Sequence, residues 1–217
     1  MTPHRRPIVR LGPVVLTVFA TGCSVVGLGA DYPEPRYSAM PVTCAQAIDS
    51  VRGGLAAFAG PLYDPAVAVR QPEQVGDPEW DSYRDYEQLV CEIDYRTGDP
   101  GDGTLTWRQV KLSFDRYETA AQRGTRRADP VGEATERLAG TERVQDNTQH
   151  FADLGDGGFA WDSFDRKSAA VMFRLGNMLV MVIPSGADAP GVPLELTARR
   201  TAAESIAREL AAGLAQR

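Results

Sequence analysis

Apolar and polar positions alternate in several parts of the chain. Residues 89–96 and 109–114 have a two-residue period, which predicts two half-buried β-strands joined by a glycine-rich turn over residues 97–104. Two further apolar runs flank Gly176-Asn177, a pair typical of a two-residue hairpin turn. Pro184 predicts the end of the second run. Shorter strands are predicted over residues 66–70 and 159–164.

Helical spacing predicts three helices around these strands. Thr43 and Gln46 have the spacing of a capping box, and Gly53-Gly54 predicts the weakening or end of the helix that they begin. Asp129-Pro130 predicts the start of a middle helix. A long helix over residues 194–215 is expected to lie across the sheet. It should pack through apolar residues at every fourth position, namely Ala198, Ala202, Ile206, Leu210 and Leu214.

Strands grouped between terminal helices, without strand-helix-strand alternation, predict an α+β domain. Its sheet is expected to be mainly antiparallel and packed by the N- and C-terminal helices. The charged and alanine-rich stretch of residues 117–149 interrupts the strands only once.

The first 23 residues combine basic side chains with an uncharged apolar run. Arginines within residues 5–10 precede the run 11–20, which ends in Ala20-Thr21-Gly22-Cys23. This order predicts an export signal with small residues at a peptidase site, and it makes Cys23 the predicted lipid attachment site. An uncleaved signal anchor is the alternative, because residues 11–30 carry no charge over about the length of a spanning helix. The general secretory and twin-arginine routes both fit the arginines.

These patterns divide the chain into a lipoprotein signal peptide (residues 1–22), a lipidated tether (23–40) and a single extracytoplasmic α+β domain (41–217). Acylation of Cys23 would hold the domain on the outer face of the cell membrane. In that oxidising compartment Cys44 and Cys91, the other two cysteines, predict one disulfide. Two separate buried thiols are the alternative.

Composition narrows the range of partners and of chemistry. The chain has 29 acidic and 23 basic side chains, so nucleic acid is not expected as a partner. His150 lacks a second histidine or a free thiol for a zinc site, and Ser185 lacks the flanking glycines of a nucleophile elbow. Neither Asp99 with Asp102 nor Asp153 with Asp156 has calcium-loop spacing, so solvated turns are expected there. We therefore assign no catalytic residue, no metal and no cofactor.

The candidate binding surface is an aromatic group set among acidic residues. Trp80, Tyr83 and Tyr86 lie between Asp77 and the first strand, and such rings stack on a sugar or a peptide. Burial of these rings over the sheet edge is the alternative.

Several short motifs together resemble one family. They are Pro41-Val42-Thr43-Cys44, Val90-Cys91-Glu92-Ile93, residues 154–160 (LGDGGFA), Leu175-Gly176-Asn177, the four residues ending in Cys23 and the alanine-rich C-terminal helix. In this combination the chain is similar to small actinobacterial secreted lipoproteins that carry the domain of unknown function 3558. The resemblance covers Pro41 to the end. It implies an extracytoplasmic α+β domain with one disulfide, similar in outline to the sensor domains of some actinobacterial membrane kinases, and no catalytic residues.

The sequence therefore predicts a non-catalytic binding, sensor or accessory module. Its partners would be the membrane, through the lipid anchor, and an unidentified protein or cell-envelope ligand. A cell-envelope hydrolase with paired carboxylates and a structural subunit of a membrane complex are the alternatives. A hydrolase would bring two carboxylates, or Ser185 and His150, together in a pocket.

Overall fold

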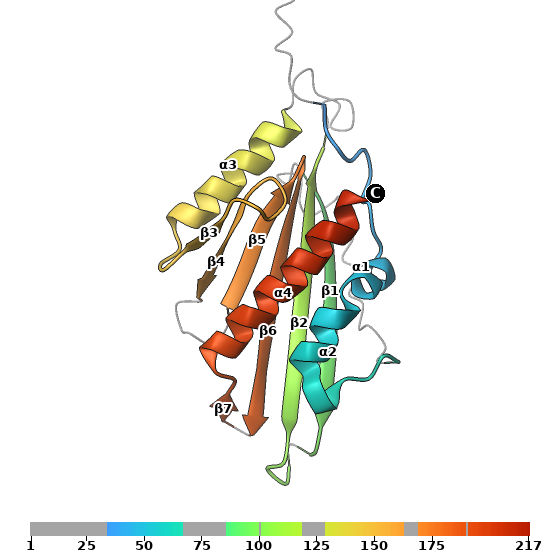
Figure 1. Cartoon of the computed structure of the whole chain (residues 1–217), viewed down its shortest axis with the longest axis vertical. Helices are drawn as coiled ribbons and strands as arrows, with labels where there is room; N and C mark the ends of the chain where they lie inside the picture. The colour runs from blue at the N-terminus through green and yellow to red at the C-terminus, as the bar shows by residue number, and fades with distance from the viewer. Residues whose placement is uncertain (1–33, 67–85, 100, 119–128, 163–168, 190) are drawn as a thin grey trace, which may run out of the picture. The chain divides into compact units, whose positions relative to one another are not determined.

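In the part of the chain that the structure describes, an antiparallel sheet of seven strands forms the centre of the fold (Figure 1). The computed structural model describes residues 34–66, 86–99, 101–118, 129–162, 169–189 and 191–217. The strand order is β1-β2-β6-β5-β4-β3, with β7 paired to β6. The strands are β1 (Tyr86–Thr97), β2 (Thr106–Tyr117), β3 (Gln149–Phe151), β4 (Gly158–Asp162), β5 (Ala169–Leu175), β6 (Met178–Ala189) and β7 (Val192–Pro193). The helices are α1 (Cys44–Ser50), α2 (Arg52–Ala59), the 3-10 helix η1 (Gly60–Leu62), α3 (Pro130–Arg143) and α4 (Leu196–Ala215).

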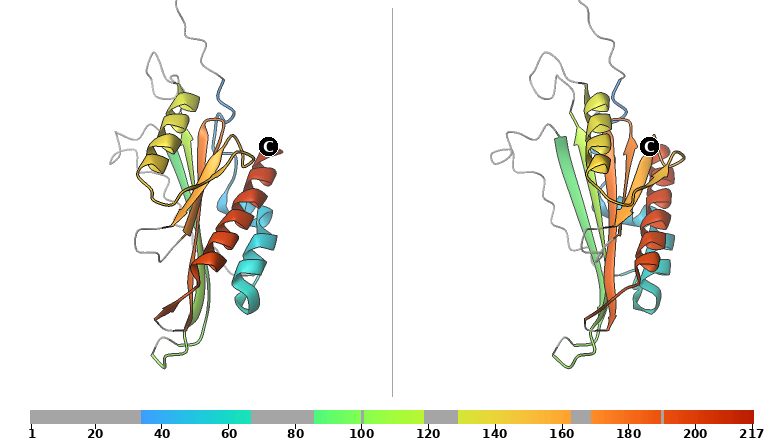
Figure 2. Two further views of the ribbon diagram at one scale, coloured as in Figure 1. Left: turned by 60° about the vertical axis from the view of Figure 1, so that its left-hand side comes forward. Right: turned by 90° about the vertical axis from the view of Figure 1, so that its left-hand side faces the viewer.

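Helices cover both faces of the sheet (Figure 2). Helices α1, α2 and α4 pack on one side, here called the first face, over fully buried residues such as Leu112 and Phe173. Helix α3 packs on the other side, the second face, where Ala134 meets Phe159 and Leu179. This arrangement confirms the predicted α+β class and the antiparallel sheet packed by terminal helices.

Two helices begin as their sequences predict. The backbone N–H of Gln46 donates to Thr43 Oγ1 (3.3 Å) and the backbone N–H of Thr43 donates to Gln46 Oε1 (2.9 Å), so both bonds of the capping box at α1 are present. At α3 the Asp129 carboxylate accepts from the Gly132 N–H (2.8 Å), and Pro130 occupies the first helical position. Both caps satisfy N–H groups that have no partner within the helix.

The glycines of the first helical segment do not end it, so of the two predicted effects, a weakened helix or its end, the end is wrong. The break falls at Val51, and Gly53 and Gly54 lie inside α2. A Cβ atom at Gly54 would lie 2.8 Å from Ile206 Cγ1 of α4, and the Gly54 N–H donates to Glu209 Oε2 (3.0 Å). The missing side chain thus lets α2 approach α4 closely, which offsets the low helix propensity of glycine.

Pro184 does not end its strand either. Strand β6 continues to Ala189, and Pro184 pairs with Val110 of β2. The pairing of β5 with β6 stops at Val171 opposite Val182, so near Pro184 the described ladder has β2 on one side only. A proline without an N–H is tolerated where one side of a strand needs no donor.

The C-terminal helix is confirmed, with one change to its packing face. Helix α4 lies across the first face of the sheet (Figure 1), and Ile206, Leu210 and Leu214 are at most 1% exposed. Ala198 is exposed, whereas Arg199 is buried. A repeat of four residues drifts by about 40° per step around a helix with 3.6 residues per turn, so Ala198 and Leu214 cannot share one face.

The disulfide between Cys44 and Cys91 is present, and it joins α1 to the middle of β1. The two Cα atoms are 5.5 Å apart and both side chains are buried. The bond therefore fixes the first helix on the first face of the sheet.

The predicted hairpin at Gly176-Asn177 is present and also holds the start of the domain. Asn177 is fully buried; its amide donates to the carbonyl oxygens of Tyr37 (2.9 Å) and Tyr117 (2.8 Å) and accepts from the Tyr37 N–H (2.9 Å). Tyr37 is itself 5% exposed. Ordered packing thus begins within the segment that the sequence assigns to the tether.

We expect Asn177→Ala to lower the free energy of unfolding by about 1–3 kcal/mol, because it leaves buried backbone groups of Tyr37 and Tyr117 without their partner. Urea denaturation of both proteins measures the difference. Gln149→Ala, at an exposed position of β3, is the control and should change stability by less than about 0.5 kcal/mol. Equal small losses for both variants would mean that the amide does not hold the segment.

The predicted strand over residues 66–70 lies almost wholly outside the described residues, and Ala66 itself is in a turn. Strand β4 confirms the start of the strand predicted over residues 159–164, whose last two residues are also outside the description. Within the described ranges, no helix is long and apolar enough to cross a membrane.

Candidate functional site

Of the aromatic residues predicted as a binding surface, only Tyr86 can be placed. Trp80, Tyr83 and Cys23, the predicted lipid attachment residue, lie outside the described residues. Tyr86 opens β1 on the second face, and its ring centroid lies 5.4 Å from that of Tyr117. It is half-buried among the apolar residues that pack with α3. Its ring therefore contributes to packing in this position.

Two cavities lie along α4. The first, which we call the Arg36 cavity, measures about 380 Å3 and is bounded by the C-terminal half of α4, the turn between β3 and β4, and Arg36. The second, the Phe58 cavity, measures about 620 Å3 and is bounded by the N-terminal half of α4, by α2 and by Arg108 of β2. The two cavities thus lie at opposite ends of one helix.

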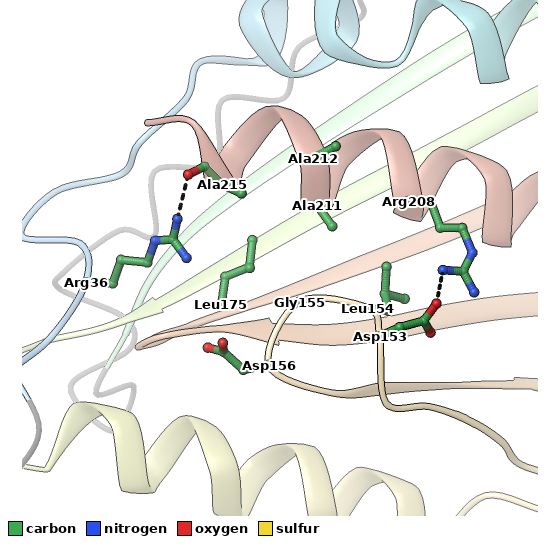
Figure 3. Close-up of a pocket in the computed structure, with 10 residues that line it drawn as sticks. All are labelled: Arg36, Asp153, Leu154, Gly155, Asp156, Leu175, Arg208, Ala211, Ala212 and Ala215. Carbon is green, nitrogen blue, oxygen red and sulfur yellow. Dashed lines mark hydrogen bonds and ion pairs between the residues drawn. The ribbon is translucent and has the colours of Figure 1, made fainter.

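Charged groups surround an alanine wall in the Arg36 cavity (Figure 3). The wall consists of Ala211, Ala212 and Ala215 of α4, with Arg36 at one end and Arg208 at the other. The Arg36 guanidinium donates to the Ala215 carbonyl oxygen (2.9 Å) and lies over the Tyr37 ring. These contacts hold the start of the domain against the last turn of α4.

The two aspartates of the Arg36 cavity are already engaged. Arg208 Nη1 donates to the Asp153 carboxylate (2.8 Å). The Asp156 carboxylate accepts from the Gly176 N–H (2.6 Å) and lies 3.3 Å from Arg174 Nη1. These bonds connect the turn between β3 and β4 with α4 and with the β5–β6 hairpin. The cavity is therefore best explained as a joint between structural elements.

The carboxyl pKa values with a resolved shift are lowered, which is the wrong direction for a general acid. The hydrogen bond from Arg208 lowers the pKa of Asp153, and hydrogen bonds from Thr104 lower the pKa of Asp102. A carboxyl group that donates a proton near neutral pH needs the opposite shift. Burial raises the pKa of Tyr95 to about 12, so this phenol stays neutral at physiological pH.

The Phe58 cavity has mostly apolar walls. Helix α2 contributes Gly54, Ala57 and Phe58, and the other side contributes Leu194, Ala198 and Ala202. A row of hydroxyl groups on α4 runs along the cavity at four-residue intervals, namely Thr197, Thr201 and Ser205. An apolar cavity of several hundred Å3 with a few convergent polar groups is typical of small-molecule sites.

Arg108 places a fixed positive charge at the Phe58 cavity. Its Nη1 donates to the carbonyl oxygens of Trp107 and Ala187 (3.0 Å each), and its Nη2 pairs with the Asp188 carboxylate. The side chain is only 12% exposed. Because its contacts hold the guanidinium in one orientation, the cavity has a charged end that needs little rearrangement to meet a polar group.

The other residues weighed from the sequence have local roles. Ser185 Oγ lies 3.5 Å from Gln109 Oε1, whereas His150 Nε2 lies 2.9 Å from Glu142 Oε1. Each residue has a different partner, and Ser185 lies within β6, beyond the strand end that Pro184 predicts.

Asp99 accepts from the Gly101 N–H (2.7 Å) and Asp102 from the Thr104 N–H (2.9 Å), as expected for turn residues. Among the described residues, no group of three His, Cys, Asp or Glu side chains is placed to hold a metal ion.

Comparisons with family models, with curated proteins and with solved structures find no match for this chain. The resemblance to lipoproteins with the domain of unknown function 3558 therefore stays a prediction.

The sequence patterns did not predict the Phe58 cavity. Its walls come from α2, α4 and β2, and the pairing of these elements is not encoded in any one segment. The available signal was the exposed side of the last helix, where Thr197, Thr201 and Ser205 recur at helical spacing beside Ala198. Small and hydroxylated residues on a helix are also common on ordinary solvated surfaces, so this signal alone does not define a site.

Proposed function

We propose that this chain is a membrane-anchored extracytoplasmic lipoprotein that acts as a non-catalytic binding module, with its ligand in the Phe58 cavity. The observation that carries the proposal is that cavity, with about 620 Å3 of space between α2 and α4. Its volume lies within the range of about 300–1,000 Å3 typical of sites for small molecules.

The walls indicate the chemical class of the ligand. Phe58, Leu194 and the alanines of α4 suit an apolar body, because its transfer from water is favourable by about 25 cal/mol per Å2 buried. The hydroxyl row, Arg108 and Glu195 suit a polar end, and the Asp188 carboxylate already pairs with Arg108. We infer a small amphipathic molecule whose polar end points toward Arg108.

The Phe58 cavity lies at the end of α4 opposite the N-terminal attachment, which supports its accessibility in a membrane-anchored protein. Arg36 docks at the C-terminal end of α4, and the Phe58 cavity lies along its N-terminal half. A helix of 20 residues is about 30 Å long. Arg36 lies 13 positions after Cys23, a stretch that reaches at most about 45 Å. An acylated Cys23 would therefore tether the domain through its Arg36 end, on a stretch long enough for the cavity to stay accessible.

We expect the mature protein to begin at an acylated Cys23. Intact mass spectrometry of protein from membranes should show loss of residues 1–22 and a mass increment for acyl chains. Cys23→Ala should abolish the increment and release the protein from membranes, since stable anchoring needs about two chains. Complete retention of Cys23→Ala in membranes would instead support the uncleaved signal anchor.

We expect the Phe58 cavity to bind an amphipathic probe through its apolar rings. The probe is 1-anilinonaphthalene-8-sulfonate, added to soluble protein that begins at Tyr32, the first residue of the unit holding the described domain. Its fluorescence should rise saturably, with a dissociation constant in about the micromolar range. Ala198→Trp, which fills the cavity from an exposed position, should weaken binding by about tenfold or more.

The matched control is Ala212→Trp, an exposed alanine of the same helix that lines the Arg36 cavity. It should leave probe binding within about twofold of the unsubstituted protein, a difference of under 0.5 kcal/mol. Equal weakening by both substitutions would place the probe elsewhere and refute the assignment of the Phe58 cavity.

A further inference from the structure

The second face of the sheet carries a group of polar side chains around one half-buried aromatic ring. Side chains of a strand alternate between the two faces, so Arg108 points to the first face and its neighbours Trp107 and Gln109 point to the second. The register across three strands places Trp107 between Arg96 of β1 and Ala187 of β6. We call Asp94, Arg96, Trp107, Gln109 and Ser185 the Trp107 cluster.

The polar members of the Trp107 cluster form a chain across three strands. Gln109 is paired directly with Asp94 on one side and Ser185 on the other. Gln109 Nε2 donates to Asp94 Oδ1 (3.0 Å), and Ser185 Oγ lies 3.5 Å from Gln109 Oε1. Arg96 Nη2 lies 3.5 Å from Asp94 Oδ2. These contacts fix the orientation of a carboxamide and a carboxylate beside the indole ring.

The members of the Trp107 cluster other than Ser185 line a cavity of about 270 Å3, to which Leu105 also contributes. Helix α3 covers the other end of the second face, where Tyr86 pairs with Tyr117 (Figures 1 and 2). Trp107 lies ten residues from Tyr117 along β2, or about 33 Å. Among the described elements, α3 is the helix that packs on this face, so the cluster lies beyond its cover.

We propose that the Trp107 cluster is a saccharide-binding site that takes one ring of a neutral oligosaccharide. An indole ring offers a flat apolar surface for the C–H face of a sugar ring. Carboxamide, carboxylate and guanidinium groups beside it supply both acceptors and donors for sugar hydroxyls. The cavity is smaller than the range of about 300–1,000 Å3 that suits drug-sized ligands. This size suits one sugar ring, and the adjoining rings of the oligosaccharide would lie on the surface of the sheet.

Charge on this surface favours a neutral ligand. Arg96 is paired with Asp94, and in the next row Lys111 Nζ lies 3.7 Å from Glu92 Oε1. The two basic and two acidic groups therefore balance each other locally, while the chain as a whole has a net charge of −6. A polyanion would find no excess of positive charge here and would be repelled by the protein at longer range.

The test uses the full chain in a detergent without a sugar headgroup. Maltotetraose and tetra-N-acetylchitotetraose are titrated while the indole N–H signals of the 15N-labelled protein are recorded, and Trp107→Phe assigns the Trp107 signal. We expect at least one of the two sugars to shift that signal saturably, with a dissociation constant below about 1 mM. No saturable shift with either sugar up to about 10 mM would overturn the proposal.

Variants separate this site from its surroundings. Affinities of the variants are measured by isothermal titration calorimetry, because substitution of Trp107 removes the reporting indole signal. Trp107→Ala should weaken oligosaccharide binding by about tenfold or more, as for the loss of a central aromatic anchor. Lys111→Ala, on the same strand and face, should change affinity by less than about twofold. If Trp107→Ala does not fold, Trp107→Phe and Gln109→Ala take its place, each with an expected loss of at least about threefold. Binding that is indifferent to all of these substitutions contradicts the assignment.

Two further comparisons identify the occupant and keep the two sites apart. A neutral tripeptide amide that shifts the Trp107 signal where both sugars fail would assign the surface to peptides and overturn the proposal. Ala198→Trp, in the Phe58 cavity on the first face, should leave oligosaccharide binding unchanged. Failure of the Phe58 cavity to bind its probe and failure of the Trp107 cluster to bind sugar are thus independent results.

Discussion

Replacing Leu210 with alanine should lower the free energy of unfolding by about 2–5 kcal/mol. Leu210 is fully buried on α4, in the core between that helix and the first face of the sheet. The substitution removes apolar surface and leaves a cavity that rigid strands cannot close. A single domain is stable by only about 5–15 kcal/mol, so the loss should be evident as a lower midpoint in urea denaturation.

The control for Leu210→Ala is Val192→Ala in β7, where the side chain is 54% exposed. That substitution should change the unfolding free energy by less than about 0.5 kcal/mol. A loss of that small size for Leu210→Ala as well would show that α4 does not pack through this position.

Removal of the disulfide should have an effect of similar size. Cys44 and Cys91 are separated by 47 positions, and closing a loop of this length is worth about 4 kcal/mol in the chain-entropy description, within a usual range of about 2–5 kcal/mol. The double substitution Cys44→Ala with Cys91→Ala should therefore lower the midpoint of thermal unfolding markedly. Both side chains are buried, so alanine introduces no polar group into the core.

Reductant provides the control for the disulfide. It should destabilise the unsubstituted protein to about the level of the double variant and should leave the double variant unchanged. Thiol labelling of denatured, unreduced protein should find neither Cys44 nor Cys91. Labelling of both cysteines would contradict the bond.

Local sequence patterns predicted much of the fold, because each of the predicted elements depends on a few neighbouring residues. The capping box at Thr43, the strands around Cys91 and Leu112 and the hairpin at Gly176 all follow from short-range rules. They predict the class of fold and the packing of α4. The disulfide followed from the count of cysteines combined with the predicted export.

The errors arise where a distant element changes what a residue does. Gly54 lies inside a helix because Ile206, about 150 residues later, needs the space. Pro184 lies inside a strand because the pairing with β5 has already ended. Neither fact can be obtained from a window of neighbouring residues, since propensity describes an isolated segment and tertiary packing overrides it.

The candidate sites were less accessible to sequence reasoning than the fold. The aromatic segment that looked most suited to binding contains Tyr86, which packs near α3. Trp107 was not singled out, because its neighbours Asp94 and Ser185 come together only through strand register. The spacing of those residues along the chain does not predict that they share a surface.

The anchorage of Tyr37 has a mechanical consequence. Within the described residues, a pull on the N-terminal side of the chain would load the exposed Arg36–Ala215 hydrogen bond and then the buried Tyr37–Asn177 hydrogen bonds. If these bonds ruptured, the chain could lengthen only as far as Cys44, which is tied covalently to β1. The seven residues from Tyr37 to Thr43 span at most about 25 Å when extended. The disulfide would therefore limit the detachment to the segment before Cys44. The Arg36 cavity would lose one of its walls, while the sheet and the Phe58 cavity would keep their shape.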